Sequence, residues 1–125
     1  MKQHLSGKQL KEISYDNRIK LLSLVTGLTR EYLGDEYKRD TKHEDELLLK
    51  YGYDVKVGEL IEIIQDYTGQ FPTPNLNNQQ YEVVVSLKNN KGEVIEAKSE
   101  LQESYCDALY DIVKFLLNND YIDLP

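Results

Sequence analysis

The stretch YEVVVSLKNNKGEVIEAKSELQESYCDALYDIVKFLLNN, from Tyr81 to Asn119, decides the fold. Apolar side chains recur at every second position from Tyr81 to Leu87, which is the period of a β-strand with one buried face. The residues Asn-Asn-Lys-Gly at 89–92 tolerate the positive φ angles that a tight turn requires. We therefore predict a β-hairpin whose second strand runs from Glu93 to Lys98.

An amphipathic helix that follows the hairpin is expected to cover its apolar face. Two strands alone are marginal in water and need such a cover. Apolar residues recur at helical spacing over residues 101–117. Either Ser99 or Ser104 is expected to cap the start of this helix, and the asparagines at 118 and 119 are expected to end it. The residues expected to meet in this core are Val83, Val85, Ile95 and Ala97 of the hairpin and Leu101, Tyr105, Ala108, Leu109, Ile112, Val113, Leu116 and Leu117 of the helix.

The N-terminal part of the chain is predicted to be mostly helical. Asp16 is expected to cap the longest of its helices, and Gly34 to end it. Gly27 lies within this helix and is either tolerated there or forms the corner between two shorter helices. Apolar spacing predicts helices over residues 7–13, 16–33, 47–51 and 57–67.

Together these patterns predict an α+β fold, with a small antiparallel sheet (the hairpin 81–98) covered by the C-terminal helix. A third strand from Tyr53 to Val57 would join the hairpin. Residues 34–45, which are almost all polar or charged, are expected to form a loop or an exposed helical turn. Residues 70–80, which are rich in proline and asparagine, are expected to be a linker or loop. We expect a single domain over residues 1–125, with a helical part at 1–52 and the α+β core at 53–125.

Composition narrows the class of protein. A hydrophobic content of 40% with 30% charged residues is that of an ordinary globular domain. No stretch is apolar for long enough to span a membrane or to form the core of a signal peptide, so we expect no membrane association and a cytoplasmic location. The single cysteine, Cys106, cannot form an internal disulfide. It lies beside the apolar stripe of the last helix, and no nearby histidine supports a catalytic thiol, so we expect a core residue.

Charge is unevenly distributed and suggests a first functional surface. Residues 1–42 hold nine lysines and arginines against six acidic residues, whereas residues 43–125 hold six against sixteen. An acidic face of this kind either is simply solvated or imitates the phosphate spacing of nucleic acid and occupies a basic groove on a partner protein. The side chains expected to form the partner-binding part of this face are Glu96, Glu100, Glu103, Asp107 and Asp111.

A second surface is suggested by residues 24–30, Leu-Val-Thr-Gly-Leu-Thr-Arg, which resemble the central turn of the helix-turn-helix family. In that motif glycine permits the sharp corner and a threonine caps the recognition helix. Thr26, however, occupies a position where the motif has an apolar residue, and Gly34 would interrupt the second helix. If the resemblance holds, the nucleic-acid contacts are Arg30, Lys38 and Arg39, and binding weakens steeply with salt.

Metal-binding and catalytic sites are not supported by the sequence. Asp40, His43 and Glu44 would share one face of a helix, but no second histidine or cysteine accompanies them. Phosphate-binding glycine loops and the common hydrolase motifs are missing from the sequence. We therefore assign no catalytic residue, no metal ligand and no cofactor, and expect a protein that is not an enzyme.

Three further segments carry a resemblance to a group of proteins. They are Val-Gly-Glu-Leu-Ile-Glu-Ile-Ile at 57–64, Asp-Ala-Leu-Tyr-Asp-Ile-Val-Lys-Phe-Leu at 107–116, and Tyr121-Ile122. These segments resemble small uncharacterised proteins encoded by gut bacteria and by their phages or mobile elements. The resemblance implies an α+β domain of prophage or mobile-element origin, and it transfers no functional residue.

The leading hypothesis from the sequence is a non-enzymatic, acidic binding or accessory protein that acts on a protein partner. The alternative is a nucleic-acid-binding regulator that uses the basic N-terminal third of the chain.

Overall fold

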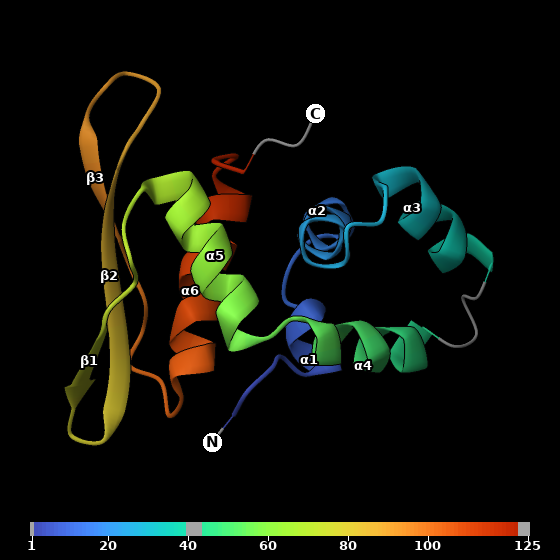
Figure 1. The fold of residues 1–125 in the computed structure, drawn as a ribbon, viewed down its shortest axis with the longest axis horizontal. Coiled ribbons are helices and arrows are strands. Elements are labelled where there is room, and N and C mark those ends of the chain that lie inside the picture. The colour runs from blue at the N-terminus through green and yellow to red at the C-terminus, as the bar shows by residue number, and fades with distance from the viewer. Residues whose placement is uncertain (1, 40–43, 123–125) are drawn as a thin grey trace. The chain divides into compact units, whose positions relative to one another are not determined.

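The computed structural model describes residues 2–39 and 44–122. The C-terminal unit contains residues 2–3 and 57–122, and the N-terminal unit contains residues 4–39 and 44–56. The former combines a sheet with two helices, and the latter consists of helices (Figure 1). The predicted α+β class is therefore confirmed. The expectation of a single domain with parts at 1–52 and 53–125 stays a prediction. The boundary between the two compact units lies after Lys56.

The predicted hairpin forms the centre of the C-terminal unit (Figure 1). Strand β2 (Gln80–Lys88) pairs antiparallel with β3 (Val94–Lys98), and Val85 lies opposite Ala97. Gly92 in the connecting loop has a φ of 78°, which an L side chain rarely adopts. Both the hairpin and its buried face are as predicted. That face contains Val83, Val85, Leu87 and Ala97, with Ile95 half-buried.

A third strand, which the sequence patterns did not reveal, lies on the other side of β2. Strand β1 (Pro74–Asn77) pairs antiparallel with β2. The connecting residues Asn78 and Gln79 have φ values of 51° and 66°, as in the primed turns that suit a two-residue hairpin. The predicted loop over 70–80 is therefore wrong at residues 74–77, which form β1, and at Gln80, which begins β2. Proline is tolerated at the start of an edge strand, and asparagine in the turn that follows it.

Helix α6 (Tyr105–Asn118) packs on the sheet beside α5 (Val57–Thr68). It begins at the second of the two predicted caps, since the Ser104 Oγ accepts the Asp107 N–H at 3.1 Å. Leu101 was predicted to join the buried stripe, and this is wrong: it precedes the cap and is 44% exposed. The buried residues of α6 are Cys106, Ala108, Leu109, Tyr110, Ile112, Val113, Leu116 and Leu117.

The connection from β3 to α6 continues the pairing with β2. The Ser99 hydroxyl is buried and accepts the Val83 N–H at 2.8 Å, while the Ser99 N–H donates to the Val83 carbonyl at 2.8 Å. Tyr81 and Gln102 then exchange two backbone hydrogen bonds of 2.7 and 2.9 Å. This short connection is therefore held to the sheet before the helix starts.

Four helices form the described part of the N-terminal unit (Figure 1). They are α1 (Gly7–Leu10), α2 (Tyr15–Thr26), α3 (Arg30–Arg39) and α4 (Glu44–Asp54). The cap of α2 is Ser14, whose Oγ accepts the Asn17 N–H at 3.2 Å, and not Asp16 as predicted. The strand predicted over Tyr53–Val57 is also wrong, because Tyr53 and Asp54 complete α4 and Lys56 makes only a single bridge to His4.

Two glycines that directly follow predicted helices, at 16–33 and 47–51, lie inside helices in the structure. Gly34 falls within α3, so of the two alternatives for residues 34–45 the loop is wrong at its start and the residues up to 39 are helical. Gly52 falls within α4, where a side chain would stand only 3.0 Å from the Leu5 carbonyl oxygen and from the Ser6 carbonyl carbon. Glycine is needed at position 52 because α4 passes so close to the backbone that leads into α1.

Candidate functional site

The corner between α2 and α3 lies in the segment that resembles a helix-turn-helix turn. Gly27 ends α2 with a φ of 76°, so the interpretation of this residue as a corner is the correct one. The Ser23 hydroxyl donates to the Leu28 carbonyl at 2.7 Å, and the Thr26 hydroxyl accepts the Leu28 N–H at 3.2 Å. A polar residue at position 26 is explained by this bond. Leu33, six residues after Gly27, is fully buried.

The exposed side of α3 carries charges of both signs. Arg30 opens the helix and is exposed, but Glu31 and Asp35 are exposed beside it. Lys38 and Arg39 lie in the last turn, and their side chains fall outside the described part of the structure. From His4 to Lys56 the sequence contains ten lysines and arginines and ten acidic residues, so this unit has no net charge. The expected basic surface is therefore much weaker than the count over residues 1–42 suggested.

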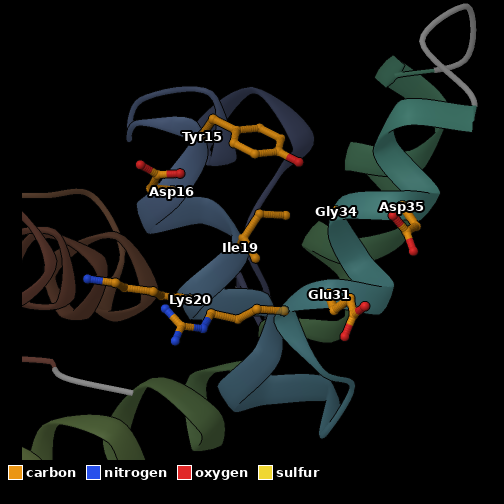
Figure 2. A pocket seen from close by; sticks show the side chains of 8 residues that line it. Tyr15, Asp16, Ile19, Lys20, Glu31, Gly34 and Asp35 are labelled. Carbon is orange, nitrogen blue, oxygen red and sulfur yellow. The ribbon is translucent and has the colours of Figure 1, made fainter. Parts of the chain in front are cut away.

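A groove of about 630 Å³ lies between α2 and α3, within the N-terminal unit. Figure 2 shows Tyr15 extending from α2 toward Gly34 of α3. Two cationic and three anionic side chains line this groove, so it has no dominant charge. The lining residues are Tyr15, Asp16, Ile19, Lys20, Arg30, Glu31, Gly34 and Asp35.

Not every basic residue of the N-terminal unit is available to a ligand. Arg18 is 8% exposed and donates through Nε to the Leu10 carbonyl at 2.9 Å and through Nη2 to the Ile13 carbonyl at 3.4 Å. Its Nη1 also lies 3.4 Å from Glu44 Oε1. The guanidinium therefore closes the C-terminal end of α1, and Glu44, one of the candidate metal ligands, is an ion-pair partner.

The predicted acidic face divides into two groups. Glu96, Glu100 and Glu103 are exposed, and their carboxylates make no hydrogen bond or ion pair with the residues that the structure describes. Asp107 and Asp111 are half-buried and bonded within the C-terminal unit. Only the first group presents unoccupied carboxylates to solvent.

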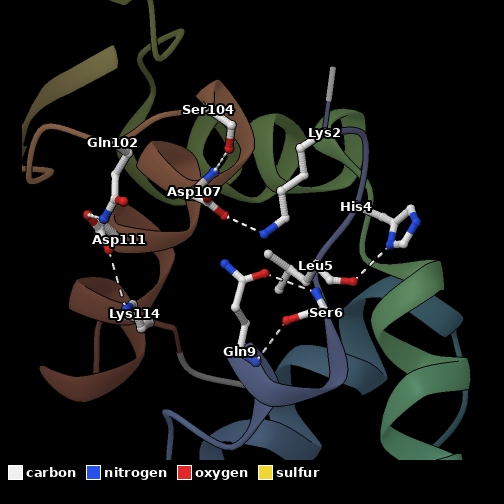
Figure 3. Close-up of polar contacts among 10 residues, drawn as sticks. All are labelled: Lys2, His4, Leu5, Ser6, Gln9, Gln102, Ser104, Asp107, Asp111 and Lys114. Carbon is white, nitrogen blue, oxygen red and sulfur yellow. Dashed lines mark hydrogen bonds and ion pairs between the residues drawn. The ribbon is translucent and has the colours of Figure 1, made fainter. Parts of the chain in front are cut away.

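Asp107 holds the N-terminal segment against α6. The Lys2 Nζ donates to Asp107 Oδ1 at 2.8 Å, with side-chain exposures of 33% and 22% (Figure 3). Lys2 is placed there because the Gln3 carbonyl accepts the Val57 N–H at 3.0 Å, which fixes the start of the chain beside α5. The carboxylate also lies in the first turn of α6, where negative charge favours the helix. Asp107 therefore has a structural explanation.

Asp111 fastens the β3–α6 connection to the helix. Its Oδ2 accepts the Glu100 N–H at 3.1 Å and the Gln102 Nε2–H at 2.8 Å. Its Oδ1 lies 3.3 Å from the Lys114 Nζ (Figure 3). The side chain is only 14% exposed, so these bonds largely satisfy the carboxylate. The spacing of acidic residues could not predict this role, because Glu100 and Gln102, which bond to Asp111, lie in an irregular connection.

Cys106 is buried, as predicted. Burial raises the pKa of its thiol to about 11, with the neighbouring Asp107 carboxylate adding to the rise and the Lys2 ammonium opposing it. A thiol with a raised pKa is protonated at neutral pH and is a poor nucleophile.

Across residues 2–39 and 44–122 no group of three or more His, Cys, Asp and Glu side chains is placed to hold a metal ion. Asp40 and His43 of the weighed candidate cluster lie outside the described residues. No helix in the same ranges is both long and apolar enough to cross a membrane.

Comparison with known proteins gave no match to a family model, to a curated protein or to a solved structure. The resemblance to small proteins of gut bacteria and their mobile elements stays a prediction.

Proposed function

We propose that this chain is a non-enzymatic binding protein that recognises a positively charged protein partner through the exposed glutamates of its C-terminal unit. The observation that carries the proposal is the distribution of charge between the two units. Outside His4–Lys56 the sequence holds five lysines and arginines against twelve acidic residues, which accounts for the whole formal charge of −7. A field of one sign steers oppositely charged partners and raises their association rate.

The side chains that would contact the partner are Glu96, Glu100 and Glu103. They are exposed and lie on β3 and on the connection that follows it. Asp107 and Asp111 contribute to the negative field but keep their internal bonds. The carboxylates could then meet basic side chains of the partner, in the manner of an accessory or inhibitory factor that covers a basic surface.

The test is affinity capture from host lysate with two variants of equal net charge. The first variant carries Glu96→Gln, Glu100→Gln and Glu103→Gln. The control carries Asp16→Asn, Glu31→Gln and Asp35→Asn, which remove three exposed carboxylates from the N-terminal unit. We expect a basic protein to be retained at low salt by the native chain and the control and to be lost with the first variant. Equal retention by both variants would refute the proposal.

A second candidate function is nucleic-acid binding through α2 and α3. The left-handed corner at Gly27 and the start of α3 at Arg30 favour it. The carboxylates of Glu31 and Asp35 on the exposed side of α3 weigh against it, because phosphates would be repelled there. Retention on DNA at low salt that is lost in Arg30→Glu would support this function in place of the first. Arg30→Gln is the control, because it removes the positive charge of the side chain without reversing it.

A further inference from the structure

Strand β3 is an edge of the sheet, whose strand order is β1–β2–β3 (Figure 1). Just after β3, the Ser99 N–H donates to the Val83 carbonyl of β2 at 2.8 Å. Hydrogen-bonded pairs alternate along an antiparallel ladder, so the residues of β3 that bond to β2 are Ala97 and Ile95. The backbone groups of the other residues of β3 point away from β2.

The outward residues of β3 are Val94, Glu96 and Lys98. No group in the described part of the chain bonds to their outward N–H and carbonyl groups. Such a row of unpaired backbone groups is a template for an added strand. The edge is therefore able to accept another strand, and the side chains along it decide which strand that is.

The charges of β3 complement those of a second β3 in one antiparallel register. Pairing of two copies about Glu96, or about Lys98, would set that residue opposite its own charge, and like charges in that position destabilise a sheet. Pairing about Ile95 would set no charged residues of β3 opposite each other. Pairing about Ala97 sets Glu96 of each copy opposite Lys98 of the other. Of the registers centred on a residue of β3, this one places opposite charges directly across the new ladder.

Pairing about Ala97 also suits the backbone and the packing of the edge. Glu96 and Lys98 are then hydrogen-bonded partners, and each such pair exchanges two main-chain bonds. Ala97 meets its own copy in a non-bonded pair, where the strands approach most closely and a small side chain fits. Ile95, which is half-buried, lies opposite the small Ser99 of the second copy.

The charged side chains of the two strands form a square on the exposed side of the sheet. Each Glu96 has a Lys98 at both adjacent corners, one from its own strand and one from the other copy, while like charges lie on the diagonals. Residues directly opposite each other interact more strongly than diagonal neighbours do. The Lys98 side chain is 62% exposed and its Nζ lies 3.7 Å from a carboxylate oxygen of Glu82, so it has room to contact a second carboxylate.

Charges beyond β3 favour the same arrangement. The turn end of the hairpin carries the exposed Lys88 and Lys91 together with the exposed Glu93. The connection at the other end of the edge carries the exposed Glu100 and Glu103. Antiparallel pairing sets the turn of each copy beside the connection of the other, so a net positive end meets a negative one. The formal charge of −7 on each copy opposes association, but this repulsion is screened beyond about 8 Å at physiological salt.

We propose that the chain forms a symmetric dimer in which the β3 strands of two copies pair antiparallel about Ala97 and join the two sheets into one. This inference goes beyond the proposed function and does not depend on it. The interface is small, so the dimer is weak, with a dissociation constant on the order of 100 μM. Dimerisation brings the exposed glutamates of two copies into one assembly.

The experiment mixes two charge-reversal variants of the full chain. In Glu96→Lys the square would hold only cations, and in Lys98→Glu only anions, so neither variant should pair with itself. A one-to-one mixture restores a cation opposite every carboxylate of the square. The variants have formal charges of −5 and −9, so overall attraction cannot explain association of the mixture. Glu62→Lys, on the exposed side of α5, makes the same change of charge away from the edge and is the matched control.

Sedimentation velocity at about 0.15 M salt and at protein concentrations up to about 1 mM measures each association. We expect the native chain, Glu62→Lys and the mixture to dimerise alike, and each charge-reversal variant alone to dimerise about tenfold more weakly. A native chain that stays monomeric, or that adds only a strand of a foreign protein to β3, would overturn the proposal. So would a mixture that associates no better than its components. Circular dichroism of each variant confirms that the sheet is retained.

Lys98→Glu also separates this proposal from the proposed function, because it keeps Glu96, Glu100 and Glu103. If the native chain is monomeric while Lys98→Glu still retains a basic protein from lysate, the dimer alone fails. If the native chain dimerises and no basic protein is retained, the proposed function alone fails.

Discussion

Asp111→Ala is the substitution that tests most directly whether this carboxylate is structural. In the native chain the side chain accepts the Glu100 N–H and the Gln102 side-chain amide and pairs with Lys114. Alanine removes all of these contacts and leaves the β3–α6 connection without its bond to the helix. By contrast, Glu103 lies nearby, is exposed, and makes no side-chain hydrogen bond or ion pair with the described residues.

The expected loss follows from the kind and burial of each contact. A hydrogen bond to a charged acceptor contributes about 1.5 kcal/mol, and the exposed Glu100 N–H regains much of this by binding water. The pair with Lys114 contributes about 0.5 kcal/mol, since it is an i,i+3 pair at a partly exposed position. Alanine itself favours the helix over aspartate by about 0.5 kcal/mol. We expect a net destabilisation of about 1.5 kcal/mol for Asp111→Ala and less than about 0.5 kcal/mol for Glu103→Ala.

The measurement is urea unfolding followed by far-ultraviolet circular dichroism, with Gln102→Ala as the second arm of a double-mutant cycle. A coupling energy between Asp111 and Gln102 is expected, because each single variant removes the same 2.8 Å bond. Equal small losses for Asp111→Ala and Glu103→Ala, together with no coupling to Gln102, would refute the structural role. Asp111 would then again be a candidate residue of the partner-binding face.

Three further predictions concern the core. Leu109 is fully buried in α6, so Leu109→Asp should unfold the C-terminal unit by burying an unpaired carboxylate, which would collapse the dispersion of its NMR spectrum. Leu109→Met should keep a native spectrum and lower the free energy of unfolding, measured with urea, by less than about 1.5 kcal/mol. The pKa of the Cys106 thiol rises on folding from 9.0 to about 11, so the unfolded chain loses this proton at a lower pH than the folded chain. The free energy of unfolding should therefore fall between about pH 9 and pH 11. Urea unfolding of Cys106→Ala over the same pH range should lack that part of the decline. Gly52→Ala should destabilise the N-terminal unit in thermal unfolding, because a side chain there meets the Leu5 carbonyl at 3.0 Å. Gly58→Ala, with open space around it in α5, should stabilise the C-terminal unit by about 0.5 kcal/mol. The reverse order would contradict the described packing of α4.

The sequence alone determined the elements whose pattern is local. The alternation from Val83 to Leu87 and the helical period of α6 are set by which side chains avoid water, and each is complete within one segment. The cap at Ser104 and the corner at Gly27 were each one of two alternatives that the sequence left open, and the structure decides between them. For the strand and the helix, sequence reasoning and the structure agree.

Tertiary structure decided what depends on residues far apart in the chain. Gly34 continues α3 because the helix is held by the buried Leu33, which offsets the roughly 1 kcal/mol that glycine costs in a helix. Asp107 meets Lys2, which is 105 residues away in the sequence, and Asp111 meets groups of an irregular connection. Local periodicity records which side of an element avoids water, but the partner of a charged side chain is set by how distant segments pack, and that packing divided the acidic face into structural and exposed carboxylates.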